Sequence, residues 1–137
     1  MEIGFPIEFI VSGTPVSLQV KRAESRDQWK LKIRDAGSRC LPKPHFASVG
    51  PIAISLFFFP EDKMKGDIDN MAKFILDACC NFIYVNDAQV ERLVLQKFEL
   101  DRMFNFKSPS DVLDAAMNGN RPALYVRISD NPHEDLL

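Results

Sequence analysis

The sequence predicts a single small α/β domain in which helices flank a mixed four-stranded sheet. Its 137 residues are the length of one compact domain, and that length can bury a hydrophobic core without disulfides. Strand-like and helix-like segments alternate in the order β-α-β-α-β-α-β, which is typical of an α/β sandwich around one sheet. Apolar residues make up 46% of the chain and charged residues 26%, as in globular proteins. We therefore expect one domain over residues 1–130 and a flexible tail over residues 131–137.

The first half of the chain predicts a strand followed by a helix. Apolar and polar side chains alternate over residues 5–12, which is the period of a half-buried strand. Residues 24–36 predict a helix whose inner face carries Trp29 and Ile33, four positions apart, with charged residues elsewhere. We expect this helix to end at Gly37, because glycine commonly follows the last helical turn.

The second half predicts the central strand, two helices and two further strands. Residues 51–59 (PIAISLFFF) are almost continuously apolar, which indicates a central strand covered on both faces. Residues 67–80 predict a helix with an apolar stripe and a separate polar stripe. A strand is expected over residues 90–99 and a short helix over residues 110–117. The last strand is marked by Leu124, Val126 and Ile128.

Composition excludes several classes of protein. No segment approaches the roughly 18 consecutive apolar residues that a membrane span needs, so we expect no membrane partner. Residues 1–4 (MEIG) lack the start of a signal peptide, and we expect a cytoplasmic protein. Cys40 stands alone while Cys79 and Cys80 are adjacent, a pattern that argues against both a disulfide framework and a zinc site.

The net charge of −2 hides one basic segment. Residues 21–43 contain eight Lys or Arg and only three Asp or Glu, whereas the rest of the chain is acidic. Such a segment can bind the phosphate backbone of a nucleic acid. It can equally be the solvated face of a helix. Charge alone leaves both interpretations open.

Two short segments carry the residues with the clearest chemistry, residues 67–73 (DIDNMAK) and residues 85–90 (VNDAQV). Cleavage of a phosphodiester needs an activated water and stabilisation of charge on the phosphate oxygens. Carboxylates that hold Mg²⁺ or Mn²⁺ can provide both. Asp67, Asp69 and Asp87 are candidate ligands, and Lys73 lies one helical turn after Asp69 in the predicted helix.

Each of these residues also has an ordinary structural explanation. Asp67 could cap the helix by accepting a backbone N–H, and Asp69 could complement the helix dipole in the first turn. Asp69 and Lys73 could form a surface ion pair, worth about 0.2–0.5 kcal/mol. Asp87 could be a turn residue. Asp77, on the same polar stripe, is expected to be solvated or to support the site from outside.

The two segments together resemble the signature of the RusA family of Holliday junction resolvases. That signature contains D-x-D-N, a lysine four residues after the second Asp, and D-D-A-Q-V after the helix. Residues 67–90 match it closely, with Asn86 in place of the first Asp of D-D-A-Q-V. The strand at 51–59 and the segment at 13–17 (GTPVS) match more loosely.

The resemblance implies a RusA-like fold and a homodimer with one acidic site in each subunit. Two strands of a four-way DNA junction would then be cut symmetrically during recombination and repair. The metal ligands carry over to Asp67, Asp69 and Asp87, and the family's lysine carries over to Lys73. The similar proteins occur in bacteria and their prophages. The catalytic set implied is therefore Asp67, Asp69, Lys73 and Asp87.

Two departures from this pattern keep other functions open. Asn86 could lower metal affinity, and the chain is mildly acidic for a protein that binds branched DNA. DNA binding would depend on basic residues gathered on one face, including Lys21, Arg22, Lys65 and Lys73. One alternative is a non-catalytic or weakly active DNA-binding accessory protein with the same fold. Another is a nuclease for flaps or other branched DNA.

Overall fold

The structure is a computed structural model that describes residues 1–16, 22–64, 66–102, 104–134 and 136. Four strands and three α-helices alternate along these residues, with short 3-10 helices η1 and η2 on either side of α2. The predicted α/β class and the order of the elements are confirmed. The elements are β1 (Ile7–Ser12), α1 (Ala23–Ser38), β2 (Ile52–Phe59), η1 (Ile68–Met71), α2 (Ala72–Cys79), η2 (Asp87–Gln89), β3 (Val90–Lys97), α3 (Asp111–Asn118) and β4 (Ala123–Ser129).

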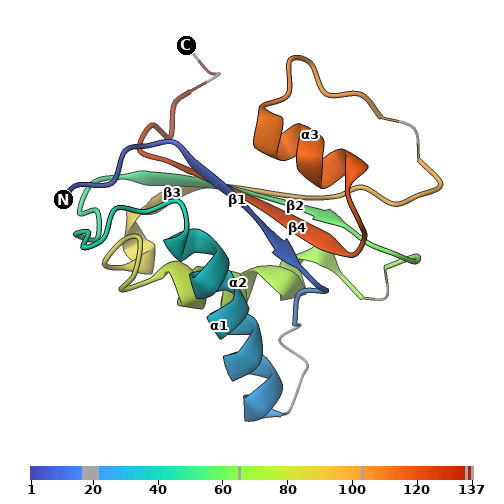
Figure 1. The fold of residues 1–137 in the computed structure, drawn as a ribbon, viewed down its shortest axis with the longest axis horizontal. Coiled ribbons are helices and arrows are strands. Elements are labelled where there is room, and N and C mark those ends of the chain that lie inside the picture. The colour runs from blue at the N-terminus through green and yellow to red at the C-terminus, as the bar shows by residue number, and fades with distance from the viewer. Residues whose placement is uncertain (17–21, 65, 103, 135, 137) are drawn as a thin grey trace.

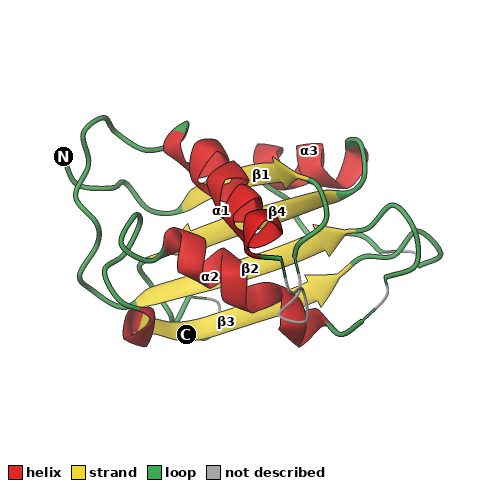
Figure 2. Ribbon diagram, turned by 90° about the horizontal axis from the view of Figure 1, so that it is seen from below, coloured by secondary structure: helices red, strands yellow, loops and turns green. Residues whose placement is uncertain are grey.

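The strands form one mixed sheet with the order β1-β4-β2-β3. β4 runs antiparallel to both β1 and β2, and β3 runs parallel to β2. β1, β2 and β3 therefore point the same way, and their carboxyl ends lie at the same end of the sheet (Figure 2). As predicted, β2 is central, because it pairs with a strand on each side. The loops after β1 and β2 both leave from this carboxyl end.

The main core lies between the sheet and the pair of helices α1 and α2, which cover one of its faces (Figures 1 and 2). Trp29 and Ile33 point inward from α1 as predicted, with 3% and 1% of their surface exposed. Ile75 of α2 is also fully buried in this cluster. Burying each such side chain stabilises the fold by about 1.5–3 kcal/mol, so the core holds α2, and the residues it carries, firmly against β2 and β3.

Two sequence predictions about helix ends are corrected. α1 continues through Gly37 to Ser38, because Gly37 is buried beside the ring of Phe9 and keeps a helical backbone. The helix predicted over residues 67–80 is divided: residues 68–71 form the 3-10 turn η1, and the α-helix begins only at Ala72. Asp67 and Asp69 therefore stand before the α-helix.

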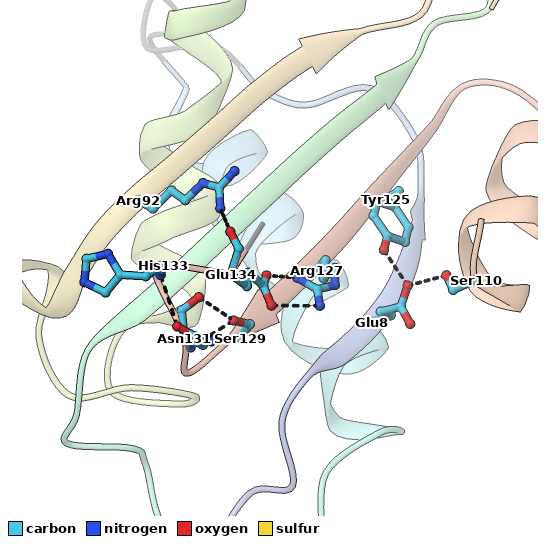
Figure 3. Close-up of polar contacts among 9 residues, drawn as sticks. All are labelled: Glu8, Arg92, Ser110, Tyr125, Arg127, Ser129, Asn131, His133 and Glu134. Atoms are coloured by element: carbon cyan, nitrogen blue, oxygen red, sulfur yellow. Dashed lines mark hydrogen bonds and ion pairs between the residues drawn. The ribbon is translucent and has the colours of Figure 1, made fainter. Parts of the chain in front are cut away.

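The opposite face of the sheet is covered by α3 (Figure 1). An aromatic cluster around Phe59 and Phe98 packs there. Glu8 of β1 accepts hydrogen bonds from Tyr125 of β4 and from Ser110, the residue that caps α3 (Figure 3). These bonds fix α3 to the sheet.

The segment after β4 folds back over the same face. Glu134 pairs with Arg127 of β4, and its backbone carbonyl accepts a hydrogen bond of 2.6 Å from Arg92 of β3 (Figure 3). The hydrogen bond from Arg127 lowers the pKa of Glu134. The described residues of the predicted tail thus make specific contacts with two strands, while the proposed division at residue 130 stays a prediction.

Candidate active site

Asp67 and Asp69 lie on a turn at the carboxyl end of β2. Asp67 has an extended backbone, and its side chain makes no capping hydrogen bond to the residues of η1. The N–H of Asn70 instead donates to the backbone carbonyl of Asp67, at 3.2 Å. Within the described ranges neither Asp67 nor Asp69 forms an ion pair, and both are exposed. The capping explanation of Asp67 is therefore wrong, and both carboxylates face solvent.

Lys73 does not pair with Asp69. Its Nζ lies 2.7 Å from Asp77 Oδ1, one turn further along α2, and 3.9 Å from Asp87 Oδ2. The hydrogen bond to Asp77 raises the pKa of Lys73, and the carboxylate of Asp87 adds to the shift. Lys73 is therefore a cation at neutral pH, suited to contact a phosphate oxygen and unsuited to accept a proton. Its side chain is half exposed.

Asp87 is held against α2 by the buried Tyr84. The Tyr84 hydroxyl lies 3.0 Å from Asp87 Oδ1 and 3.1 Å from the backbone carbonyl of Leu76, in α2. Burial raises the pKa of Tyr84 well above its usual value, so the hydroxyl stays protonated and can donate. One oxygen of Asp87 thus faces Tyr84 while the other faces Lys73, and 40% of the side chain remains exposed. A turn residue without further contacts would not be fixed in this way.

Asn86 and Gln89 build the loop that carries Asp87. The Asn86 side chain accepts from the N–H of Ala88 at 2.8 Å, and Gln89 Oε1 accepts from the N–H of Asn86 at 2.8 Å, which is a capping box. Gln89 Nε2 donates to the carbonyls of Ser48 and Gly50, both at 2.8 Å. Asn86 is therefore used for local structure. An aspartate could accept the same bond, so this role alone does not require the amide.

The arrangement brings together some of the predicted site residues and separates others. Lys73, Asp77 and Asp87 form one ionic group across α2 and η2. No three Asp, Glu, His or Cys side chains among the residues described are gathered closely enough to hold a metal ion. Mg²⁺ prefers carboxylate ligands. The carboxylates of Asp67, Asp69 and Asp87 do not converge in this structure, so in this arrangement they do not fit a metal ion.

Comparison with protein families decides what kind of protein carries this site. The sequence model of the endodeoxyribonuclease RusA family matches residues 13–128 of the 137-residue chain. The chain belongs to the RusA endodeoxyribonuclease family. The match spans both motif segments, so the resemblance drawn from residues 67–90 is confirmed. Comparison with curated proteins gives no match.

Membership in the RusA family supports a nuclease, that is, a hydrolase that cuts phosphodiester bonds in DNA. Nucleases of this family generally depend on a divalent metal ion. No helix in the described part of the chain is long and apolar enough to cross a bilayer.

The basic residues expected to bind DNA divide into three groups. Lys21 and Lys65 lie outside the described residues. Arg22 is exposed just before α1, and Lys73 belongs to the ionic group described above. Other basic residues of the 21–43 segment hold the fold together: Lys32 donates to the carbonyl of Ser12 at 3.0 Å and Arg34 to that of Ala78 at 2.9 Å. The positive charge of that segment is thus partly structural.

Sequence reasoning missed Tyr84 and Gln89 as residues that position the site. Both lie within three residues of Asp87 in the segment IYVNDAQV, and both have apolar neighbours: Ile83 and Val85 flank Tyr84, and Ala88 and Val90 flank Gln89. That placement was the available signal, because a buried hydroxyl or amide has to find a partner. The identity of the partner depends on how η2 folds against α2, which the linear spacing does not reveal.

Proposed function

We propose that the chain is a metal-dependent, structure-specific endonuclease that resolves four-way (Holliday) junctions by paired symmetric incisions in recombination and repair. The observation that carries the proposal is the family match over residues 13–128, which includes both halves of the motif. The geometry supports it in one respect: Lys73 Nζ and Asp87 Oδ2 lie 3.9 Å apart, although the two residues are fourteen positions apart and belong to different elements. Mg²⁺ is the proposed metal, with Mn²⁺ as a substitute.

The proposed metal ligands are Asp67, Asp69 and Asp87. All three present carboxylate oxygen to solvent, and hard divalent cations bind such oxygen. The ion would supply an activated water and charge neutralisation at the phosphate. The three carboxylates do not converge on one point among the residues described in this structure. We assign to Lys73 the binding of a phosphate oxygen, since its ammonium is charged and half exposed.

The proposal includes a homodimer, because symmetric cutting of two strands needs two sites. Branched DNA would be bound through Lys21, Arg22, Lys65 and Lys73, and such binding weakens as salt is raised. A cytoplasmic location and a bacterial or prophage origin stay predictions. Sedimentation or light scattering of the purified chain tests the dimer.

The deciding experiment compares Asp69→Asn with Asp101→Asn on a labelled four-way junction, with linear duplex and flap controls. Both variants remove one negative charge from an exposed aspartate, but Asp101 lies outside both motif segments, on a turn after β3, and its side chain is 73% exposed. We expect Asp69→Asn to abolish incision and keep junction binding, because loss of an acid does not weaken attraction to phosphate. We expect Asp101→Asn to cut like the parent. If Asp69→Asn cuts junctions at the parental rate, the assignment of the site is wrong.

The second candidate is a DNA-binding accessory protein that keeps the fold and cuts weakly or not at all. It is favoured by the separation of the carboxylates and by the use of Asn86 as a cap. Titration of Mg²⁺ and then Mn²⁺ against the protein and a synthetic junction separates the two candidates. Binding without incision at every metal concentration supports the accessory protein. Preferential cutting of flaps supports a nuclease for other branched DNA.

A further inference from the structure

A cavity of about 470 Å³ lies directly beside Asp67, at the carboxyl end of the sheet. One wall comes from Thr14 and Pro15, which follow β1, and the other from the segment that begins at Pro60, which follows β2. Figure 2 shows the loops after β1 and β2 leaving from the same end of the sheet. Ligands of open α/β sheets bind outside the carboxyl ends of their strands, and a volume of this size lies within the range of about 300–1,000 Å³ for small-molecule sites.

The floor of the cavity is apolar and buried. Phe58 of β2 and Met71 of η1 line it, and each has only 2% of its surface exposed. Pro15, Pro60 and Met64 add further apolar surface. A flat, uncharged ring can replace water on such a floor, and methionine sulfur makes favourable contacts with aromatic rings.

The rim of the cavity is acidic. Among the residues described there, it carries the carboxylates of Glu61, Asp62 and Asp67 and the ammonium of Lys63. It favours a neutral group that donates hydrogen bonds, because a carboxylate can only accept them. Asn70 adds a neutral polar group to the same rim.

We infer that this cavity receives one unstacked nucleobase of the DNA substrate, next to the phosphate that is cut. The inference rests on the proposed nuclease function, in which Asp67 attends the scissile phosphate, and Asp67 also lines the cavity. A base at the branch point lacks a stacked neighbour on one side, so it leaves the helix at low cost. The carboxylates of the rim favour bases with an exocyclic amino group, namely adenine, cytosine or guanine, because that group offers two N–H donors, whereas unpaired thymine offers only its ring N3–H. The cavity is therefore the determinant of sequence preference at the incision.

The test fills the cavity without touching the proposed catalytic residues. Thr14 is exposed on the loop after β1, so Thr14→Trp places a ring in the cavity mouth, while Thr14→Val keeps the size of the side chain as the matched control. The full-length chain and both variants are bound, without added metal, to four-way junctions with 2-aminopurine at each position around the branch point. We expect the fluorescence to rise severalfold at one position with the parent and Thr14→Val, and to stay flat with Thr14→Trp. No rise at any position, or an equal rise with Thr14→Trp, overturns the inference.

A second measurement maps incision on junctions that offer all four bases beside the cut. The parent and Thr14→Val should cut at least about tenfold faster next to an amino-bearing base than next to thymine, the discrimination expected of a good base contact. Thr14→Trp should lose this preference, and an unchanged preference overturns the inference. A 2-aminopurine response without any incision keeps the cavity assignment and contradicts the nuclease. Incision without base preference or fluorescence response supports the nuclease and contradicts the cavity assignment.

Discussion

Replacement of Tyr84 by phenylalanine tests whether the core positions Asp87. The substitution removes one hydroxyl and leaves the fully buried ring in place. The lost group lies 3.0 Å from Asp87 Oδ1 and 3.1 Å from the carbonyl of Leu76. A hydroxyl has a single proton, so it donates to one of these acceptors at a time, and the charged carboxylate is the stronger one.

The expected loss of stability depends on which partners the Asp87 carboxylate and the Leu76 carbonyl find once the hydroxyl is removed. A hydrogen bond to a charged group contributes about 1.5–3 kcal/mol. Asp87 is 40% exposed and can be hydrated instead, and the Leu76 carbonyl keeps its bond from the N–H of Cys80 at 3.0 Å. We therefore expect Tyr84→Phe to lower the free energy of unfolding by about 1–2 kcal/mol. For a chain of this length that corresponds to a fall in Tm of about 3–6 °C.

The assay combines thermal unfolding with metal-dependent junction cleavage, and Tyr125→Phe is the matched control. Tyr125 is also buried and also donates to a carboxylate, that of Glu8, but on the opposite face of the sheet (Figure 3). Both variants should lose stability. Only Tyr84→Phe should slow cleavage, by about tenfold, because a small displacement of a site residue is costly. Equal cleavage by the two variants would refute the idea that Tyr84 positions Asp87.

Two further outcomes are expected. Asn86→Ala should lower the free energy of unfolding by about 0.5–2 kcal/mol in urea titrations, because it removes a cap. Asn86→Asp should match the parent, since its side-chain oxygen can still accept from the N–H of Ala88. Equal losses of stability in the two variants would contradict a capping role. The pKa of Glu134 is lowered chiefly by its hydrogen bond from Arg127. The pair therefore stabilises the fold above the unfolded pKa of about 4.3 and is lost as pH falls through the lower folded pKa. Unfolding of Glu134→Gln should show a weaker dependence on pH between about 5 and 3 than the parent; parallel curves would show that the pair contributes nothing.

The architecture was predictable because hydrophobic periodicity reports directly on burial. The continuous apolar segment at residues 51–59 predicted a central strand, and β2 lies inside the sheet with β4 on one side and β3 on the other. Helix ends were less predictable. Gly37 was expected to end α1, but burial beside Phe9 keeps it helical. The segment at 67–71 has helical spacing, yet residues 68–71 form a 3-10 turn. The prediction was wrong here because spacing alone cannot distinguish a 3-10 turn from the first turn of an α-helix.

The sequence proposes which residues form the site, but it does not predict how they are arranged. Spacing on an ideal helix places Lys73 beside Asp69, but the 3-10 turn removes that register, and the lysine pairs with Asp77 and Asp87 instead. Asp77 was expected to be peripheral, and its contact with Lys73 at 2.7 Å is the shortest of the group. Contacts between α2 and η2 depend on how the chain folds between them. No local pattern contains that information.

The two halves of the proposed site are held in different ways, and this difference bears on how the site can assemble. Asp87 is tied to buried structure through Tyr84 and through the capping loop of Gln89, whose side chain makes four hydrogen bonds. Asp67 and Asp69 stand at η1 with exposed side chains, and the described hydrogen bonds of this turn, from Asn70 N–H to Asp67 and from Ala72 N–H to Asp69, join backbone groups. Closing the distance between the carboxylates therefore costs least if the turn at 67–71 moves toward Asp87. A divalent ion that binds the closed arrangement more tightly than the open one would shift the population by that difference in affinity.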